Sequence, residues 1–427
     1  MGLLIAFIVL LVLFAAGIPV AFSLMASTLL YFVIATDLNL SILVQRMMGG
    51  VESIPLLAVL FFVAAGILMN YTGMSRRIIK FSEVLTGHLP GGLAQVNVLL
   101  STMMGGLSGS SLADAAMQSK ILVPEMTKKG YSVGFSTAVT AASSQITPII
   151  PPGIALIIYG YIGNVSIAKL FMAGIVPGIM ICIMMMITVH FISKRRGYLP
   201  SRPKMARPKE ILVTSRPAIL ALFLPVIIIG GIRIGAFTAT EAGAIAVVYA
   251  LILGMYYREM KWADLKVSIS ETVTTTSSIL LIIAAASGLG WILTWERIPQ
   301  RATEYVTSMV DSPTTFLLIL TVFLLIIGMF MEGNVSLVIL TPLLIPIINA
   351  YGIDPVHFGI IFIMNLAIGT LTPPLGTIMF MTCSITGCKF QDYMKEITPF
   401  LIMLIIALFM IIYIPAISLW LPNLLMN

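Results

Sequence analysis

Long apolar stretches separated by short polar segments run through the whole chain. Most are near the ~20 residues that an α-helix needs to cross the ~30 Å hydrocarbon core of a bilayer, so the pattern predicts an all-α polytopic membrane protein. Residues 86–127 differ, because two apolar arms surround a Gly- and Ser-rich tip at 105–114. Each arm, at roughly 12–16 residues or about 20–24 Å, is too short to span. We expect a re-entrant helical hairpin, although Gly and Ser also allow ordinary spanning helices to pack closely.

The next apolar segment, residues 131–162, is interrupted by prolines at 148, 151 and 152 and by Gly153. A proline inside a helix removes a backbone donor and clashes with the preceding turn. We therefore predict a broken transmembrane helix whose carbonyl groups are exposed near the middle of the membrane. Helix 166–193 follows. With scaffold helices in 1–80, these elements form a first unit, residues 1–193.

The positive charge of the chain is concentrated in one segment. The chain is 59% hydrophobic and 10% charged, with a formal net charge of +7. Residues 194–216 hold eight basic residues and one acidic residue, so they account for the whole excess. Basic loops lie on the cytoplasmic side of membranes, so we predict a cytoplasmic loop between two halves and no nucleic-acid site. The N-terminus lacks a basic segment before its apolar run, and we expect a retained helix rather than a signal peptide.

The second half, residues 217–427, runs in a similar order. The pattern predicts scaffold helices in 217–266, a helix at 268–295, a hairpin at 312–350, a broken helix at 354–384 and a terminal helix at 397–424. The first hairpin is flanked by basic residues, including Arg76, Arg77 and Lys128, and we place its open end in the cytoplasm. The second hairpin follows a charged segment placed outside, so the two hairpins are predicted to open to opposite sides.

One constant difference in residue number, 222, relates the two halves, and we call it the repeat offset. It carries Gly and Pro residues of the first half onto Gly and Pro residues of the second, without gaps. The matches that define it are Gly106 with Gly328, Pro124 with Pro346, Gly130 with Gly352, Pro151 with Pro373 and Pro152 with Pro374. Paired broken segments in two inverted repeats indicate the binding site of a secondary transporter. Helix N-termini there would attract an anion, and unwound carbonyl groups would suit a hard cation such as sodium.

Four stretches, in this order, resemble the large membrane subunit of tripartite ATP-independent periplasmic (TRAP) transporters. They are 107–116 (LSGSSLADAA), 140–152 (TAASSQITPIIPP), 235–242 (GAFTATEA) and 365–376 (NLAIGTLTPPLG). The resemblance covers nearly the whole chain. It implies sodium-driven import of an organic acid, with the sialic-acid branch favoured and C4-dicarboxylates next, across a bacterial inner membrane. It also implies an elevator motion, in which a transport domain carrying both hairpins slides against a scaffold.

The resemblance implies partners as well. These are a small four-helix membrane subunit, expected as a separate chain, a periplasmic substrate-binding protein, membrane lipids and the small anionic substrate itself. Sodium is the expected coupling ion, and no organic cofactor or catalytic residue is expected. Gly153 and Gln145 depart from the residues common in the family, which leaves the roles of side chains at these two positions open.

The likeness and the helix breaks together predict the site residues. Substrate contacts are expected from polar side chains that can bind a carboxylate or hydroxyl groups, namely Ser108, Ser110, Gln145 and Thr372. Sodium ligands, most of them main-chain carbonyl groups, are expected at both tips and both breaks: Ser108, Gly109, Ser110, Ser111, Thr147, Pro148, Glu332, Gly333, Asn334, Gly369, Thr370, Thr372 and Pro373.

Acids inside apolar segments are costly in lipid and are functional by default. Glu332 is expected to act on sodium or substrate, with a structural ion pair as the alternative. Asp114 is a second such acid, which could instead pair with Lys120 or cap the helix after the tip. Glu241, three residues after Thr238, is typical of a capping box at a helix start.

Two other functions remain to be weighed. A stand-alone sodium-coupled dicarboxylate symporter or antiporter would have a related architecture but no soluble binding protein. An intramembrane serine hydrolase is suggested by the motif around Ser108 and by a G-x-S-x-G match around Ser132. Neither motif follows a strand, and the three histidines are predicted at the membrane edges, far from Ser108. The cysteines show no metal spacing and are expected as packed free thiols.

Overall fold

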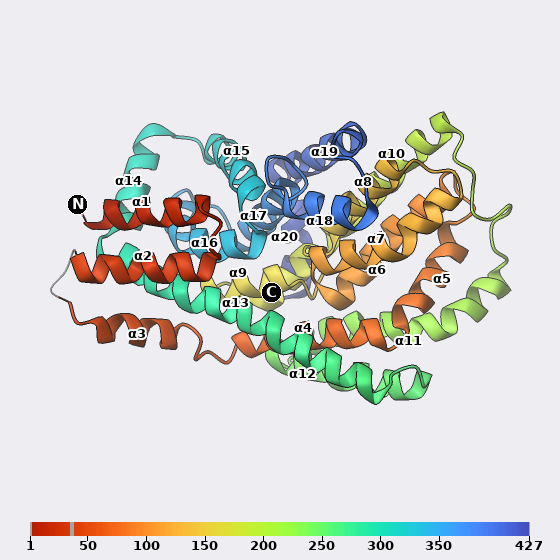
Figure 1. The fold of residues 1–427 in the computed structure, drawn as a ribbon, viewed down its shortest axis with the longest axis horizontal. Helices are drawn as coiled ribbons and strands as arrows, with labels where there is room; N and C mark the ends of the chain where they lie inside the picture. The colour runs from red at the N-terminus through yellow and green to blue at the C-terminus, as the bar shows by residue number, and fades with distance from the viewer. Residues whose placement is uncertain (1, 35–37, 427) are drawn as a thin grey trace.

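The computed structural model describes residues 2–34 and 38–426, and every regular element in these ranges is a helix (Figure 1). The all-helical fold predicted from the apolar pattern is thereby confirmed. In chain order the helices are α1 (Gly2–Ala15), α2 (Val20–Ile34), α3 (Leu40–Gly49), α4 (Leu56–Tyr71), α5 (Met74–Thr86), α6 (Gly92–Ser108), α7 (Ser111–Lys128), α8 (Val133–Ser143), a 3-10 turn (Ser144–Ile146), α9 (Ile154–Ile162), α10 (Ile167–Arg196), α11 (Pro208–Arg233), α12 (Ala239–Tyr257), α13 (Trp262–Trp295), α14 (Ile298–Met309), α15 (Pro313–Phe330), α16 (Gly333–Ala350), α17 (Pro355–Gly369), α18 (Thr377–Thr386), α19 (Phe390–Tyr413) and α20 (Ala416–Leu425).

Seven helices of the described chain are long and apolar enough to cross a membrane. They are α10, α11, α12, α13, α15, α16 and α19. Helices α4 and α5 together make an eighth candidate, bent by 73° at the break between them. Helices α6 and α7 are absent from this group for different reasons. Helix α6 has 17 residues, whereas α7 has 18, longer than the predicted arm, and is excluded by its polar and charged composition. The arms of the second hairpin, α15 and α16, each reach 18 residues, so re-entry of either hairpin stays a prediction.

Each half contains a hairpin followed by an interrupted helix. In the first half, α6 and α7 are followed by α8 and α9, with an irregular segment at 147–153 between them. In the second half, α15 and α16 are followed by α17 and α18, with an irregular segment at 370–376. The prolines explain both interruptions, because they cannot donate to the previous turn. Both Pro-Pro bonds, Pro151–Pro152 and Pro373–Pro374, are cis.

The two halves are interleaved in space. The second arm of the first hairpin, α7, packs against α18, which belongs to the second half. In return α16, the second arm of the second hairpin, packs against α9 of the first half. Figure 1 shows α6 and α7 reaching the centre from one end of the long axis, and α15 and α16 from the other. The hairpin tips and the two helix breaks therefore meet near the centre of the molecule.

The remaining helices flank this centre. Helix α4 packs against α12 and α13, and α5 packs against α11. The start of α12 carries the predicted capping box, since Glu241 N–H donates to Thr238 Oγ1 (3.3 Å) and Glu241 Oε2 accepts from Thr238 N–H (2.7 Å). The three cysteines are free thiols, as expected.

The structure differs from the expected elements in four places. Residues 208–216, expected inside the basic loop 194–216, already belong to α11. The charged residues predict a mixed loop around Arg46 and Glu52 and an outer segment at 296–311, but residues 40–49 and 298–309 form helices α3 and α14. Both helices are amphipathic, so their polar residues lie on one side rather than ending the helix. The segment expected as a single terminal helix at 397–424 is two helices, α19 and α20. The chain turns at Ile414–Pro415, because proline has no N–H to continue the first helix.

Candidate functional site

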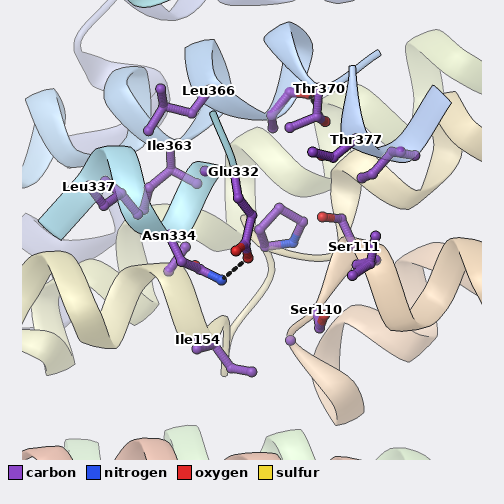
Figure 2. A pocket seen from close by; sticks show the side chains of 17 residues that line it. Ser110, Ser111, Ile154, Glu332, Asn334, Leu337, Ile363, Leu366, Thr370 and Thr377 are labelled. Atoms are coloured by element: carbon purple, nitrogen blue, oxygen red, sulfur yellow. Dashed lines mark hydrogen bonds between the residues drawn. The ribbon is translucent and has the colours of Figure 1, made fainter. Parts of the chain in front are cut away.

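A cavity of about 240 Å³ lies where the two hairpin tips meet the two helix breaks. Figure 2 shows the labelled side chains that surround it, which come from both halves of the chain. Its wall is formed by Gly109, Ser110, Ser111, Leu112, Pro148, Ile154, Ala155, Glu332, Gly333, Asn334, Leu337, Ile363, Leu366, Ala367, Thr370, Thr377 and Ile378. The wall combines an apolar floor with a few polar groups, which is the usual composition of a small-molecule site.

Four helices begin at this cavity. The wall includes the first residue of each of these helices, namely Ser111 of α7, Ile154 of α9, Gly333 of α16 and Thr377 of α18. Helix α7 is capped by the Ser110 side chain, which accepts from Ala113 N–H (3.4 Å). The other three have no side-chain cap. The first N–H groups of a helix have no partner inside the helix and carry the positive end of its dipole. The cavity is therefore suited to bind an anion.

One carboxylate also faces the cavity. Glu332 stands at the start of α16 and accepts a hydrogen bond from Asn334 Nδ2 (3.0 Å). In Figure 2 its side chain points into the space between the tips, with Ser110 and Ser111 on the other side. In the described chain this side chain is exposed and forms no ion pair. The alternative considered for Glu332, a structural ion pair, is therefore not found among the described residues.

The repeat offset reappears in the cavity wall. Five pairs of wall residues are related by it, one member from each half. The pairs are Ser110 with Glu332, Ser111 with Gly333, Leu112 with Asn334, Pro148 with Thr370 and Ala155 with Thr377. Corresponding positions of the two halves thus line one site together.

The structure places eight of the predicted site residues in the wall. These are Gly109, Ser110, Ser111, Pro148, Glu332, Gly333, Asn334 and Thr370. The other predicted residues lie behind it. Ser108 is buried and donates to Met104 O (3.3 Å). Gln145 is buried, with its Nε2 donating to Ala141 O (2.9 Å) and its Oε1 accepting from Thr370 Oγ1 (3.5 Å).

The remaining predicted residues support the breaks. Thr147 Oγ1 contacts Ser101 O (3.4 Å), and Thr372 Oγ1 donates to Gly369 O (2.8 Å). Pro373 follows in the same break and is half-buried. Gly369 packs on the backbone of Gly328, because a Cβ atom on Gly369 would lie 2.5 Å from Gly328 Cα. Their predicted roles in binding sodium or substrate stay predictions.

The sequence prediction missed several wall residues. Leu112, Ala155 and Thr377 could have been found by applying the repeat offset to Asn334 and to the helix starts after the breaks. The apolar residues of α16 and α17 carry no such signal. Leu337, Ile363, Leu366 and Ala367 look like any other core residues along the chain, and only the packing of α16 on α17 brings them to the cavity.

The second acid, Asp114, lies away from the cavity. It is buried at 1% exposure, and its carboxylate accepts from Ser101 Oγ (2.7 Å), Gln118 Nε2 (2.8 Å to Oδ1) and Thr147 Oγ1 (3.3 Å). Lys120 is exposed, and the cap of α7 is supplied by Ser110. Neither the ion pair with Lys120 nor the capping role considered for Asp114 is present.

Two chemical alternatives can be compared with these contacts. Among the described residues, no three His, Cys, Asp or Glu side chains are grouped as metal ligands, so any cation would bind chiefly through main-chain, hydroxyl and amide oxygens. The Ser108 hydroxyl donates to a carbonyl group of its own helix, and His357 contacts Ser418 (2.7 Å). A serine nucleophile needs a base within hydrogen-bond reach, and these contacts do not supply one.

Comparison with known proteins identifies close relatives. A family model described as the tripartite ATP-independent periplasmic transporter, DctM component, matches residues 7–417. The sialic acid TRAP transporter large permease protein SiaM of Vibrio cholerae is 39% identical over 410 residues, covering 96% of each chain. The 2,3-diketo-L-gulonate TRAP transporter large permease protein YiaN of Escherichia coli is 39% identical over 404 residues, covering 94% of each chain. The C4-dicarboxylate TRAP transporter large permease protein DctM of Pseudomonas aeruginosa is 37% identical over 373 residues, covering 87% of each chain.

A solved structure has a similar fold. The YdaH transporter of Alcanivorax borkumensis superimposes with a TM-score of 0.64 at 13% identity, over 89% of this chain and 88% of that one. At this identity the likeness concerns the fold alone.

Proposed function

The chain belongs to the family of the DctM component of tripartite ATP-independent periplasmic transporters, and from this premise we propose that its central cavity binds a small organic anion together with sodium. The protein is a TRAP-type large permease for organic acids. It is a multi-pass protein of the bacterial inner membrane, and it is a transporter rather than an enzyme.

The convergence of four helix N-termini on one cavity carries the proposal. Three of these N-termini have no side-chain cap. At α9 the Ile154 N–H donates to Gly109 O, and at α18 the Ile378 N–H donates to Thr370 O, so the N-terminus of α16 offers the most N–H groups to a carboxylate. An anion at a helix N-terminus is stabilised both by hydrogen bonds and by the helix dipole. Ser110 and Ser111 can add hydroxyl groups at the tip of the first hairpin.

A cation is needed at the same place. Glu332 faces the cavity, and its negative charge would repel an anionic substrate. Helices α6 and α17 end next to the cavity, and the last carbonyl groups of a helix lack partners within the helix. Sodium bound by these carbonyl groups and by Glu332 would neutralise the acid and couple the two ligands.

The motion we propose is of the elevator type. The two hairpins and two broken helices would move together, because they interleave and enclose the cavity. The scaffold would be α1–α5 with α11 and α12. Small residues lie at this boundary, since Gly66 of α4 packs on the Cα atom of Ser108. Small residues let helices approach closely, which is compatible with sliding.

Partners follow from the family. We propose that a small membrane subunit covers part of the apolar surface of the scaffold and that a periplasmic substrate-binding protein delivers the substrate. The three relatives named above carry the names of sialic acid, 2,3-diketo-L-gulonate and C4-dicarboxylate. We favour sialic acid as the substrate, with a C4-dicarboxylate next.

Uptake into proteoliposomes tests this function. The chain would be reconstituted with its small membrane partner, with the cognate binding protein outside. Labelled sialic acid, a C4-dicarboxylate and 2,3-diketo-L-gulonate would be offered separately, with and without an inward sodium gradient. We expect uptake of one of them only when both sodium and the binding protein are present. Uptake that ignores the binding protein would instead identify a stand-alone symporter, and uptake that ignores sodium would remove the coupling ion from the proposal.

A further inference from the structure

A second cavity, of about 440 Å³, lies between α7 and α18, which pack against each other. We call it the α7–α18 cavity, and its wall includes Ser119, Lys120, Pro124, Thr127, Ile385 and Thr386. Both helices begin at the central cavity. Ser119 follows the first residue of α7 by eight residues, which is about 12 Å of helix. The α7–α18 cavity therefore lies farther along the same two helices, toward the end of α7 that we place in the cytoplasm.

The wall of this cavity carries one positive charge that no acid neutralises. Among the described residues of the wall, Lys120 is the only charged one, and none of the ion pairs in the described chain includes it. The next acid along α7, Glu125, is paired with Lys128 instead, at 2.7 Å. A lysine within a membrane protein normally faces a water-filled cavity and marks the path of an ion or a substrate. The ammonium group of Lys120 is thus available to an anion in the cavity.

A free hydroxyl group lies next to this lysine. Ser119 is 1% exposed, belongs to the wall, and its Oγ atom has no hydrogen-bond partner. The other two hydroxyl groups of the wall are satisfied, because Thr127 Oγ1 donates to Pro124 O (2.9 Å) and Thr386 Oγ1 donates to Thr382 O (2.8 Å). A buried hydroxyl group without a partner costs free energy. The Ser119 hydroxyl can therefore donate to a ligand that also contacts the neighbouring ammonium group, and a carboxylate accepts both kinds of hydrogen bond.

The repeat supplies a matching cavity that has no charge. It has a volume of about 330 Å³ and is lined by residues of α9, α16 and α13. The repeat offset relates the two cavities, since it pairs Lys120 with Pro342 and Asn164 with Thr386, and each pair has one member in each wall. None of the described residues in the wall of the matching cavity is charged. The shared geometry of the two halves therefore does not require a lysine, and its charge is specific to one side of the central cavity.

We propose that the α7–α18 cavity is a second binding site for an organic anion, whose carboxylate is held by Lys120 Nζ and Ser119 Oγ. At about 440 Å³ it is larger than the central cavity, at about 240 Å³, so an anion that fits the central cavity has room here too. A positive charge on this side alone draws the anion toward the cytoplasm after it leaves the central cavity. This role in release rests on the proposed transport function, whereas the binding of a carboxylate does not.

Charge-selective labelling of a cysteine in the wall tests the binding. A cysteine-free complex in nanodiscs, with Cys182, Cys383 and Cys388 changed to alanine, would carry Ile385→Cys as the reporter. Ile385 is an apolar residue of the wall, so every polar group of the cavity is retained. The rates of reaction with an anionic and a cationic methanethiosulfonate reagent would be measured without sodium, each relative to its rate with free cysteine. We expect the anionic reagent to be favoured, and Lys120→Gln to lower this preference by roughly tenfold.

Added organic acids then show what the site accepts. Sialic acid, succinate and 2,3-diketo-L-gulonate would be tested one by one, and at least one should slow labelling by the anionic reagent in the parent and not in Lys120→Gln. Lys120→Arg should keep the charge preference, and Ser119→Ala should keep it while weakening the protection. Lys129→Gln, which removes an exposed lysine outside the wall, should change neither.

Several results would overturn the site. These are the same charge preference with and without Lys120, a lack of protection by all three acids, and a reporter cysteine that neither reagent reaches. Protection by inorganic phosphate as strong as that by the acids would overturn the assignment to a carboxylate.

Uptake measures the role in release separately. Lys120→Gln should lower the maximal rate of uptake severalfold and leave its sodium dependence unchanged, because Lys120 is not part of the central wall. A normal maximal rate in Lys120→Gln would overturn the role in release. A parent that labels as expected but transports none of the acids would instead contradict the proposed function and leave the carboxylate site standing.

Discussion

At the residue scale, the cavity contains one acid facing two serines across the space between the hairpin tips. Helix N-termini favour an anion there, whereas Glu332 disfavours it, and this opposition is the reason to expect a cation beside the substrate. A charged group contributes about 1.5–3 kcal/mol to a hydrogen bond or ion contact in a protein, which corresponds to roughly tenfold to a hundredfold in affinity. Small changes at this residue should therefore be measurable.

We predict that Glu332→Gln weakens the apparent sodium affinity of uptake by roughly tenfold or more, while the protein is still made and inserted. The reason is the loss of the negative charge at the cavity with little change in shape. The sodium dependence of uptake in proteoliposomes measures it. Glu125→Gln is the control, because Glu125 is an exposed acid at the open end of the first hairpin, paired with Lys128. Normal sodium dependence in Glu332→Gln would show that this acid has another role.

A second prediction concerns the tip of the first hairpin. Gly109 has φ +60°, and a Cβ atom there would lie 2.5 Å from Pro152 O and 3.0 Å from Ile154 N. Gly109→Ala should therefore both strain the backbone, at about 1–2 kcal/mol, and push the tip away from the break, with a loss of most uptake. Gly130→Ala is the matched control, since Gly130 also has positive φ but has nothing within 4 Å of such an atom. It should lower the unfolding temperature and spare uptake, and equal uptake by the two variants would contradict the proposed tip contact.

At the element scale, much of the helical pattern could be predicted from the sequence. Apolar length predicts the long spans, and proline and glycine predict the breaks. Helices α3 and α14 were missed because their charged residues resemble those of loops when hydropathy alone is considered. The partners of Asp114 were missed for another reason. Ser101 and Thr147 become its neighbours only when α6, α7 and the break pack together, and no spacing along the chain indicates this.

The candidate site, too, could be predicted only in part from the sequence. The repeat offset predicts that corresponding positions of the two tips and breaks line the same site, and five pairs of wall residues follow it. Ser108 and Gln145 were expected at the cavity because they lie beside the tip and the break in sequence. Their side chains instead donate to carbonyl groups one turn earlier in the chain, Ser108 to Met104 O and Gln145 to Ala141 O. Neighbourhood in sequence predicts the region of a site but not which side of a helix faces it.

The packing of the second hairpin on its broken helix leads to a third prediction. Gly328 of α15 contacts the backbone of α17, since a Cβ atom on it would lie 3.0 Å from both Gly369 Cα and Leu366 O. Gly328→Val should separate these helices, cost about 1–3 kcal/mol as overpacking does, and reduce uptake. Thermal unfolding and uptake together measure this. Gly230→Ala in α11, where nothing lies within 4 Å, should leave both unchanged or slightly raise stability. A stable, active Gly328→Val protein would show that α15 and α17 need not stay in contact.

At the scale of the whole molecule, side chains of the described residues form few hydrogen bonds between the proposed moving part and the scaffold. One of them joins Tyr161 of α9 to the carbonyl oxygen of Gly50, after α3, at 3.1 Å. A tyrosine two residues earlier in α9, Tyr159, instead donates to Pro355 O within the interleaved part, at 2.7 Å. The two tyrosines offer a direct comparison between a contact across the proposed sliding boundary and one inside the moving part.

We predict that Tyr161→Phe changes the rate of uptake by roughly twofold to tenfold, because a lost hydrogen bond of about 0.5–1.5 kcal/mol would favour one position of the moving part over another. Tyr159→Phe removes a comparable bond and should lower the unfolding temperature while leaving the rate nearly unchanged. Uptake rates and unfolding temperatures of both variants would be measured side by side. If Tyr159→Phe alters the rate and Tyr161→Phe does not, the boundary between scaffold and moving part has been placed wrongly.

The interleaving of the two halves also has a consequence for how the protein is made. Helix α7 leaves the ribosome long before α18, against which it packs, and α9 long before α16. Until synthesis is nearly finished, the first half carries surfaces whose partners do not yet exist, so it cannot complete its own core. Neither half is a self-sufficient folding unit, and a gene cut within the basic loop should give fragments that accumulate only when both are produced in the same cell.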